Sequence, residues 1–289
     1  MTPSFCEVSM SKVWFITGAS RGFGREWSIA ALERGDRVAA TARDSAALAD
    51  LVARFSDAVL PLRLDVTDRA ACFEAIAATV ARFGRLDVVV NNAGYGQFGM
   101  VEELSEAEAR AQIETNLFGA LWVTQAALPQ LRAQGSGHLI QVSSIGGISA
   151  FAGIGIYHAS KWGLEGLSQA LALEVAPFGI KVTLVEPGSY STDWGDVSSR
   201  HAQTLPAYAA SHAAAAEVRE SRKASRGDPR ATRAAILAVV DAPEPPLRVF
   251  FGNGPLAVAT RDYEQRLATW KAWEAVSVAA QGTPAAGAG

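Results

Sequence analysis

Short apolar runs and longer amphipathic stretches alternate along the chain from residue 12 onward. The apolar runs have the length of strands, and several are apolar at every position, which is typical of parallel strands buried on both faces. The amphipathic stretches between them have the length of helices. Strands are predicted over 12–17, 37–42, 59–64, 86–91, 137–143, 180–186 and 247–251, and helices over 23–34, 45–55, 68–83, 105–133, 156–177, 228–241 and 256–277.

This alternation is the pattern of repeated strand–helix–strand units. It predicts an α/β fold of the Rossmann type, in which a doubly wound, seven-stranded parallel sheet carries helices on both faces. A ligand is expected at the carboxyl ends of the strands, where the strand order reverses. The helix over 105–133 has an apolar stripe, and Pro129 is expected to kink or end it. The stripe consists of Ile113, Leu117, Leu121 and Leu128.

Three segments depart from the alternation. Residues 1–9 show no periodicity and are predicted to be a tail, so that residues 10–279 form a single domain. The long connection at 188–227 is too long for an ordinary turn and is expected to be a substrate lid, with His201 and His212 on its surface. The Ala- and Gly-rich residues 280–289 are predicted to be a disordered tail.

Composition narrows the class of protein. With 289 residues, 49% of them hydrophobic, the chain is long enough for one large core. A net charge of −3 gives no broad cationic surface, so neither nucleic acid nor an anionic membrane is an expected partner. Cys6 and Cys72 are predicted to be free thiols without metal-ligand spacing. No secretion signal or 18-residue apolar segment is present, so a cytoplasmic location and no bound metal are expected.

The first strand ends in a glycine-rich turn. Residues 17–24 read Thr-Gly-Ala-Ser-Arg-Gly-Phe-Gly and lead into a helix. Glycines at 18, 22 and 24 permit unusual backbone angles and let backbone N–H groups approach a phosphate, which the helix N-terminus also attracts. In this context the turn indicates a dinucleotide site. Its spacing, G-x-x-x-G-x-G, differs from the commoner G-x-G-x-x-G.

A tyrosine and a lysine four residues apart begin the helix over 156–177. Because residues four apart share a helix face, the Lys161 ammonium can lie beside the Tyr157 phenol and favour the phenolate, whose ordinary pKa is about 10. Ser144 follows the fifth strand, thirteen residues before Tyr157, and can donate a hydrogen bond to a substrate carbonyl oxygen. Ser143 is the competing candidate for that role.

Together these residues resemble the short-chain dehydrogenase/reductase family over about residues 12–252. The resemblance rests on the glycine-rich turn, Asn91-Asn92-Ala93-Gly94, Asn116, Ser144, the Tyr157-x-x-x-Lys161 pair and the segment 187–192. It implies a catalytic role for Tyr157 as the general acid or base, for Ser144 in polarising the carbonyl, for Lys161 in holding the nicotinamide ribose and depressing the tyrosine pKa, and for Asn116 in organising a relay water. The implied cofactor-binding residues are Gly18, Ser20, Arg21, Gly22, Phe23, Gly24, Arg43, Asp65, Val66, Asn92, Ala93, Gly94, Tyr157, Lys161, Pro187, Gly188 and Thr192.

The end of the second strand predicts which nicotinamide cofactor is bound. An acidic residue there accepts from the ribose 2′-OH and selects NAD, whereas arginine pairs with a 2′-phosphate. Here the strand ends in Arg43, with Asp44 one residue later, and Arg21 lies in the glycine-rich turn. NADP(H) is therefore preferred over NAD(H).

The substrate pocket is expected to be bounded by aromatic and apolar side chains, which suits a largely apolar ketone, aldehyde or alcohol. Two other functions stay open: a dehydratase or isomerase on the same scaffold, and a non-catalytic protein that senses NADP(H). The resemblance further implies a homodimer or homotetramer built through the helices over 105–133 and 156–177. The predicted substrate residues are Tyr95, Phe98, Ile145, Phe151, Tyr190 and Trp194.

Overall fold

A seven-stranded parallel sheet forms the centre of the computed structural model, which describes residues 11–192, 199–221 and 223–282. The strand order is β3-β2-β1-β4-β6-β7-β9, so it reverses between β1 and β4 as the doubly wound fold requires. All six pairings in this sheet are parallel. The strands are β1 (Val13–Ile16), β2 (Arg37–Ala42), β3 (Val59–Arg63), β4 (Val88–Asn91), β6 (Gly137–Val142), β7 (Ile180–Pro187) and β9 (Arg248–Phe251).

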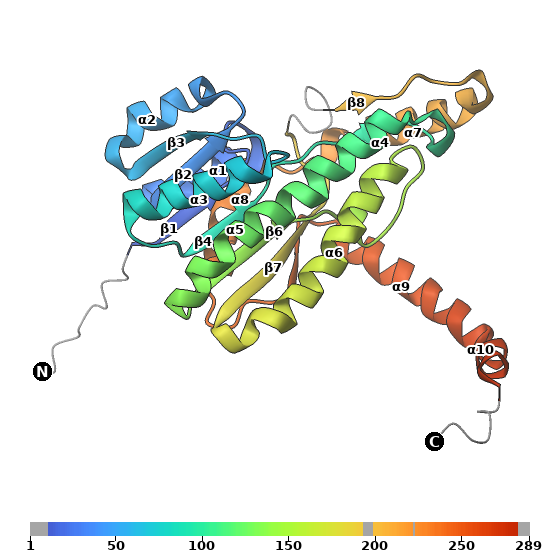
Figure 1. Cartoon of the computed structure of the whole chain (residues 1–289). Coiled ribbons are helices and arrows are strands. Elements are labelled where there is room, and N and C mark those ends of the chain that lie inside the picture. Colours follow the sequence, from blue (N-terminus) through green and yellow to red (C-terminus); the bar gives the residue numbers. More distant parts are fainter. Residues whose placement is uncertain (1–10, 193–198, 222, 283–289) are drawn as a thin grey trace, which may run out of the picture.

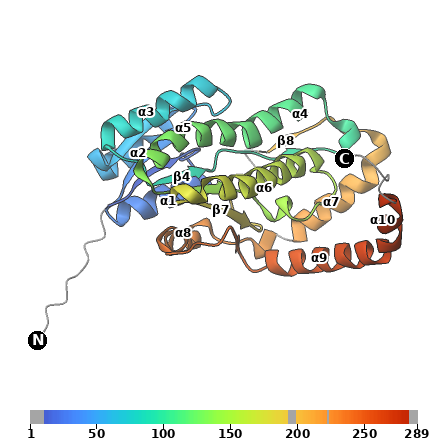
Figure 2. The ribbon, with the colours of Figure 1, turned by 60° about the horizontal axis from the view of Figure 1, so that its bottom comes forward.

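Helices cover both faces of the sheet, and each face has its own apolar core (Figures 1 and 2). Side chains alternate along β1, so Trp14 and Ile16 enter one core while Val13 and Phe15 enter the other. The first core packs against α1 (Gly22–Glu33), α2 (Ala49–Phe55) and α8 (Thr232–Asp241). The second packs against α3 (Arg69–Phe83), α5 (Gly119–Gln134) and α6 (Gly155–Val175). The predicted fold class is confirmed.

The predicted helix over 105–133 is interrupted. It consists of α4 (Glu106–Ile113), a π-helical turn (Glu114–Phe118) that holds the buried Asn116, and α5. Pro129 lies inside α5 and does not end it. The helix continues to Gln134 and is capped by Gly135, which has the left-handed conformation. Because the wider turn rotates the following residues, the buried face of α5 differs from the predicted stripe. It includes Ala120, Val123, Ala127 and Leu131, while Leu121 and Leu128 are only half-buried.

The connection between β7 and α8 contains structure of its own. A two-residue strand, β8 (Arg200–His201), pairs in parallel with β5 (Gln97–Phe98), and α7 (Ala209–Ser221) follows it. Neither was predicted: two residues are too few to show a periodicity, and α7 has no buried face that an apolar stripe would mark. Beyond the sheet, α9 (Pro255–Ala272) and α10 (Glu274–Gln281) extend toward the C-terminus (Figure 1), so residues 280 and 281 of the predicted tail are helical. Residues 1–9 and 283–289 lie outside the described residues.

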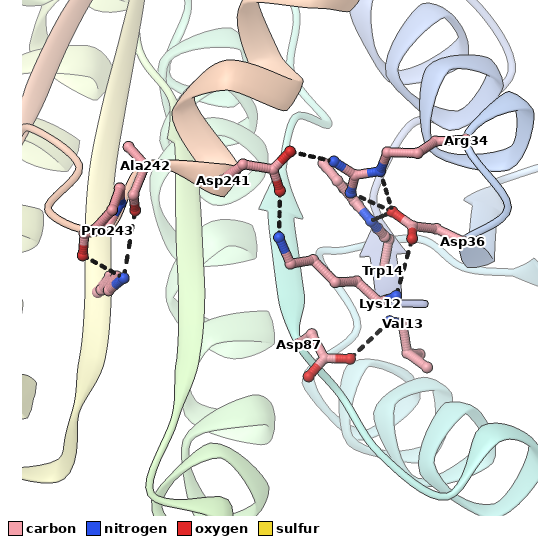
Figure 3. A network of polar contacts seen from close by, with 10 residues as sticks. Lys12, Val13, Trp14, Arg34, Asp36, Asp87, Asp241, Ala242 and Pro243 are labelled. Carbon is pink, nitrogen blue, oxygen red and sulfur yellow. Dashed lines mark hydrogen bonds and ion pairs between the residues drawn. The ribbon is translucent and has the colours of Figure 1, made fainter. Parts of the chain in front are cut away.

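A polar network fixes the amino ends of the central strands, opposite the ligand side (Figure 3). The buried Asp36 accepts hydrogen bonds from the Lys12 backbone N–H at 2.9 Å and the Trp14 indole at 2.8 Å, and pairs with Arg34. Lys12 and Arg34 both pair with Asp241 at the end of α8. This network ties β1, α1 and α8 together at the amino end of β1. It fixes the position of the strand whose carboxyl end leads into the glycine-rich turn.

Candidate active site

A large cleft of about 1220 Å³ opens at the carboxyl ends of the strands. Nearly every predicted site residue lines it, from Gly18 in the turn after β1 to Thr192 after β7. Two predicted residues, Gly24 and Asn116, lie behind its wall, and Trp194 lies outside the described residues. The cleft also contains residues that the sequence did not single out, among them Ile154, His158, Arg200, Ser211, Val218, Arg219 and Arg226.

The glycine-rich turn is held against the loop after β4 by a set of hydrogen bonds. The Thr17 hydroxyl accepts from the backbone N–H groups of Asn92 and Ala93, both at 2.9 Å. The Asn92 amide donates in return to the carbonyls of Thr17, at 2.8 Å, and Gly18, at 3.1 Å. Gly18 and Gly22 have φ angles of 65° and 56°, in the left-handed region that favours glycine. The two loops therefore form one rigid cradle.

This cradle fits a dinucleotide. A Cβ built on Gly22 would have no neighbour closer than Thr192, at 3.8 Å, so the backbone at the start of α1 is accessible from the cleft. Arg21 and Arg43 line the same cleft, and both suit a phosphate. The Asp44 carboxylate accepts the Ala46 N–H at 3.0 Å and caps a short helical turn, so it is engaged by the protein itself.

Gly24 packs too closely for any larger residue. A Cβ there would lie 2.5 Å from both the Asn92 side-chain nitrogen and the Gly18 carbonyl oxygen. We expect Gly24→Ala to lower the free energy of unfolding by about 1–3 kcal/mol and to weaken NADPH binding, because the turn must shift. Chemical denaturation and NADPH fluorescence titration measure the two effects.

Gly166→Ala is the matched control, because it is also a helical glycine but nothing lies within 4 Å of its Cβ position. That replacement is expected to be neutral or to stabilise the protein by up to about 1 kcal/mol. Equal stability of the two variants would contradict the close packing at Gly24.

The three predicted catalytic side chains converge on one wall of the cleft. Ser144 follows β6, whereas Tyr157 and Lys161 lie one turn apart near the start of α6. The Ser144 hydroxyl accepts the Gly146 N–H at 2.9 Å and also forms a hydrogen bond with Tyr157. Lys161 Nζ lies 5.9 Å from the centre of the Tyr157 ring and donates to the Val142 carbonyl at 2.8 Å.

Burial controls the charge states of this group. It raises the pKa of Tyr157 to about 12, although a hydrogen bond with Ser144 acts in the opposite direction. Burial also lowers the pKa of Lys161 to about 8, against the attraction of Glu165. For Tyr157, desolvation of the phenolate outweighs that hydrogen bond. At neutral pH Tyr157 carries its proton.

Asn116 supports the wall from behind. Its amide oxygen accepts the Tyr95 N–H at 3.1 Å, and its nitrogen donates to the Tyr95 carbonyl at 2.9 Å and to the Ser160 hydroxyl at 3.2 Å. A Cβ on Gly94 would lie 3.1 Å from the Asn116 oxygen and 3.7 Å from Lys161 Nζ. The side chain thus joins the loop after β4 to α6 beside the lysine.

His158 holds the loop that carries Ser144. Its Nδ1 lies 2.7 Å from the Gly146 carbonyl, and its Nε2 accepts the Phe151 N–H at 2.8 Å. This pattern requires the neutral ring with its hydrogen on Nδ1. Burial lowers the His158 pKa, which agrees with that form. No sequence signal marked this histidine, because its partners are backbone groups of a loop.

The segment that carries β8 and α7 is anchored by the carboxylate of Glu103. Glu103 accepts the Leu205 N–H at 2.8 Å, and His212 Nε2 lies 2.7 Å from the same carboxylate. His212 is therefore a half-buried anchor, in contrast to the predicted surface position, whereas His201 is exposed and stacks on Phe98 at 5.0 Å. These contacts hold α7, and Ser211, Ala214, Ala215 and Val218 of this helix line the cleft.

Several known proteins resemble this chain in sequence and fold. The family model for short chain dehydrogenases matches residues 12–204. The chain is 42% identical to oxidoreductase BOA17 of Botryotinia fuckeliana over 93% of this chain and 99% of that protein. It is 36% identical to 3-ketodihydrosphingosine reductase of Bacteroides thetaiotaomicron over 83% of this chain and 88% of that protein.

A solved short-chain dehydrogenase from Streptomyces avermitilis superposes with a TM-score of 0.88 at 42% identity, covering 94% of this chain and 99% of that one. Other solved structures of this fold hold NADP or NAD. Within residues 11–192, 199–221 and 223–282, no helix is both long and apolar enough to cross a membrane.

Proposed function

The chain belongs to the short-chain dehydrogenase/reductase family, and on that premise we propose that it is an NADP(H)-dependent oxidoreductase that interconverts a ketone or aldehyde and the corresponding alcohol. The observation that carries the proposal is the convergence of Ser144, Tyr157 and Lys161 on one wall of a cleft whose other end is the glycine-rich cradle. Such a site holds a reactive oxygen next to a proton donor.

In the proposed mechanism Tyr157 is the general acid for carbonyl reduction and the base for alcohol oxidation. Its hydroxyl is protonated at neutral pH, so it can donate to the carbonyl oxygen as negative charge develops there. The Ser144 hydroxyl donates a second hydrogen bond to the same oxygen. Lys161 holds the nicotinamide ribose and stabilises the phenolate that remains, while Asn116 keeps the wall in position. When bound, the cofactor supplies or accepts the hydride.

NADPH is the proposed cofactor because Arg21 and Arg43 line the cleft while Asp44 is engaged as a helix cap. The proposed nucleotide site also includes Gly18, Gly22 and Asn92, with Asp65 at the adenine end and Thr192 at the nicotinamide end. All of these residues line the cleft, and Gly22 leaves the backbone at the start of α1 accessible, which supports the proposal. Arginine pairs with a 2′-phosphate through charge-assisted hydrogen bonds.

A largely apolar substrate is proposed from the aromatic and apolar side chains of the cleft. Tyr95, Phe98, Phe151, Ile154 and Val218 all line it. The similarity to a protein named 3-ketodihydrosphingosine reductase favours an apolar ketone as well. We further propose a homodimer or homotetramer through the surfaces of α4, α5 and α6.

The test is the oxidation of NADPH, followed at 340 nm, against a panel of apolar ketones and aldehydes, with the corresponding alcohols and NADP⁺ in the reverse direction. We expect turnover of at least one apolar carbonyl, with a lower KM than that of a charged analogue of similar size. Tight NADPH binding without turnover of any carbonyl or alcohol would instead favour a sensing protein. Loss of water from a hydroxyl substrate without a redox change would favour a dehydratase.

A further inference from the structure

Two buried glutamates lie behind Lys161, outside the set of residues that the proposed mechanism uses. Glu165 follows Lys161 by one turn on α6, and Glu186 is the second-last residue of β7. Their side chains are 7% and 1% exposed. Carboxylates this deeply buried are rare unless their charge is balanced.

Only one cation of the described residues forms an ion pair with them. Arg248, the first residue of β9, places Nε 2.9 Å from Glu165 Oε2 and 3.5 Å from Glu186 Oε1. Its Nη2 donates to Gln169 Oε1 at 2.9 Å. If both glutamates were ionised, the three side chains would carry a net charge of −1 in the interior, where an uncompensated charge is costly.

Hydrogen bonding shows the same imbalance. Glu165 Oε1 and Glu186 Oε1 are both buried, and no hydrogen-bond partner reaches either oxygen among the described residues. The Ser143 hydroxyl is likewise buried and unsatisfied, and it lies with Glu165 Oε1 around the position of a Cβ on Gly147, at 2.6 Å and 3.2 Å from it. Two acceptors that lack a donor are satisfied when one proton lies between them.

Burial and the charge of Glu165 raise the pKa of Glu186 far above its usual range, although Arg248 acts in the opposite direction. A second cavity of about 350 Å³ reaches Glu186 and Arg248 and gives the proton a route to solvent. Tyr263 of α9 is the other titratable side chain on that cavity wall. On the inner side, the charge of Glu165 favours the protonated form of Lys161.

We propose that Glu165 and Glu186 share a single proton at neutral pH and release it at alkaline pH, so that the pair becomes a positioning unit that keeps Lys161 charged. At neutral pH the shared proton and Arg248 make the group neutral. When the proton leaves through the second cavity, the group gains one negative charge next to Lys161. That charge opposes the loss of the lysine proton under the alkaline conditions that favour alcohol oxidation. The role of the Glu165–Glu186 pair in turnover rests on the proposed function.

The first test replaces Glu186 with glutamine, which has the same shape but holds no exchangeable charge. The group then stays neutral at every pH, so Lys161 loses its proton earlier. The alkaline limb of kcat/KM for alcohol oxidation, measured from pH 6 to 10.5, is expected to shift down by about one pH unit. Glu165→Gln is expected to shift it in the same direction, because either replacement removes the pair.

Glu174→Gln is the matched control, because Glu174 is an exposed glutamate on the same helix. The alkaline limb of the kcat/KM profile of Glu174→Gln is expected to coincide with that of the unmodified enzyme. If the alkaline limb of Glu186→Gln also coincides with that of the unmodified enzyme, the proposed coupling of the pair to Lys161 is wrong.

A second measurement needs no turnover. Because the folded-state pKa of Glu186 is raised above the unfolded value, its contribution to stability is full below the unfolded pKa and is lost as the pH rises through the folded pKa. Glutamine does not titrate. The Tm of Glu186→Gln relative to the unmodified protein should therefore rise steadily between about pH 5 and about pH 9.

The two measurements separate the hypotheses. A Tm difference that does not change with pH overturns proton sharing by the pair. A rising Tm difference in a protein that turns over no carbonyl or alcohol keeps the shared proton, contradicts the proposed function and removes the role assigned to the pair in turnover.

Discussion

Replacing Tyr157 with phenylalanine is expected to lower kcat for carbonyl reduction by about 10²–10⁴-fold, the usual range for the loss of a positioned proton donor. The ring stays in place, so the buried wall between Ser144 and Lys161 keeps its packing. Only the hydroxyl that carries the proton is lost. The measurement is steady-state turnover of NADPH with the best substrate of the carbonyl panel.

The same variant should bind NADPH with an affinity within a few-fold of the unmodified protein, because the glycine-rich cradle and both cleft arginines are unchanged. Tyr208→Phe serves as a control, since it removes a tyrosine hydroxyl that lies between β7 and α8 and donates to Glu102 at 2.7 Å. It is expected to retain turnover. Full activity of Tyr157→Phe would rule out the proposed acid.

Arg43→Ala is expected to raise the KM for NADPH by about 10–100-fold and to leave the KM for NADH nearly unchanged, because a charge-assisted hydrogen bond contributes about 1.5–3 kcal/mol. Arg43 follows β2 directly and lines the cleft. NADH lacks the 2′-phosphate, so it loses nothing when the guanidinium is removed. Steady-state kinetics with both cofactors on one carbonyl substrate measure the difference.

Arg37→Ala is the matched control, because Arg37 is an exposed arginine at the opposite end of the same strand. It should change neither KM, and raising the salt concentration should reduce the Arg43 effect, since an exposed charge is screened. A catalytic efficiency with NADH that exceeds that with NADPH in the unmodified enzyme would contradict the assigned preference.

The strands could be predicted because their signal is local. Each of the seven apolar runs forms a strand whose ends agree with the prediction within two residues, since a strand buried on both faces must be apolar along its length. The observed strand order reverses between β1 and β4, as the predicted doubly wound sheet requires. The strand β8 could not be predicted in the same way, because it forms only by pairing with β5, about a hundred residues earlier.

The long helix shows where local reasoning fails. Its predicted stripe assumed one continuous period, but the π-helical turn at Glu114–Phe118 changes the phase, and small residues such as Ala120 and Ala127 become the buried ones. The turn forms where the Asn116 amide bonds the Tyr95 backbone, a partner on another segment. A periodicity in sequence contains no record of such a partner.

The sequence by itself determined the identities and order of the chemical groups: a glycine-rich turn after the first strand, a serine after β6, and a tyrosine and a lysine one helical turn apart. It did so because strand ends and helix spacing are local properties. Only the tertiary structure decided their charge states and their supports. Burial holds Tyr157 protonated, lowers the pKa of Lys161, and brings two glutamates from different elements behind the lysine. Desolvation depends on everything that surrounds a side chain, which no short stretch of sequence contains.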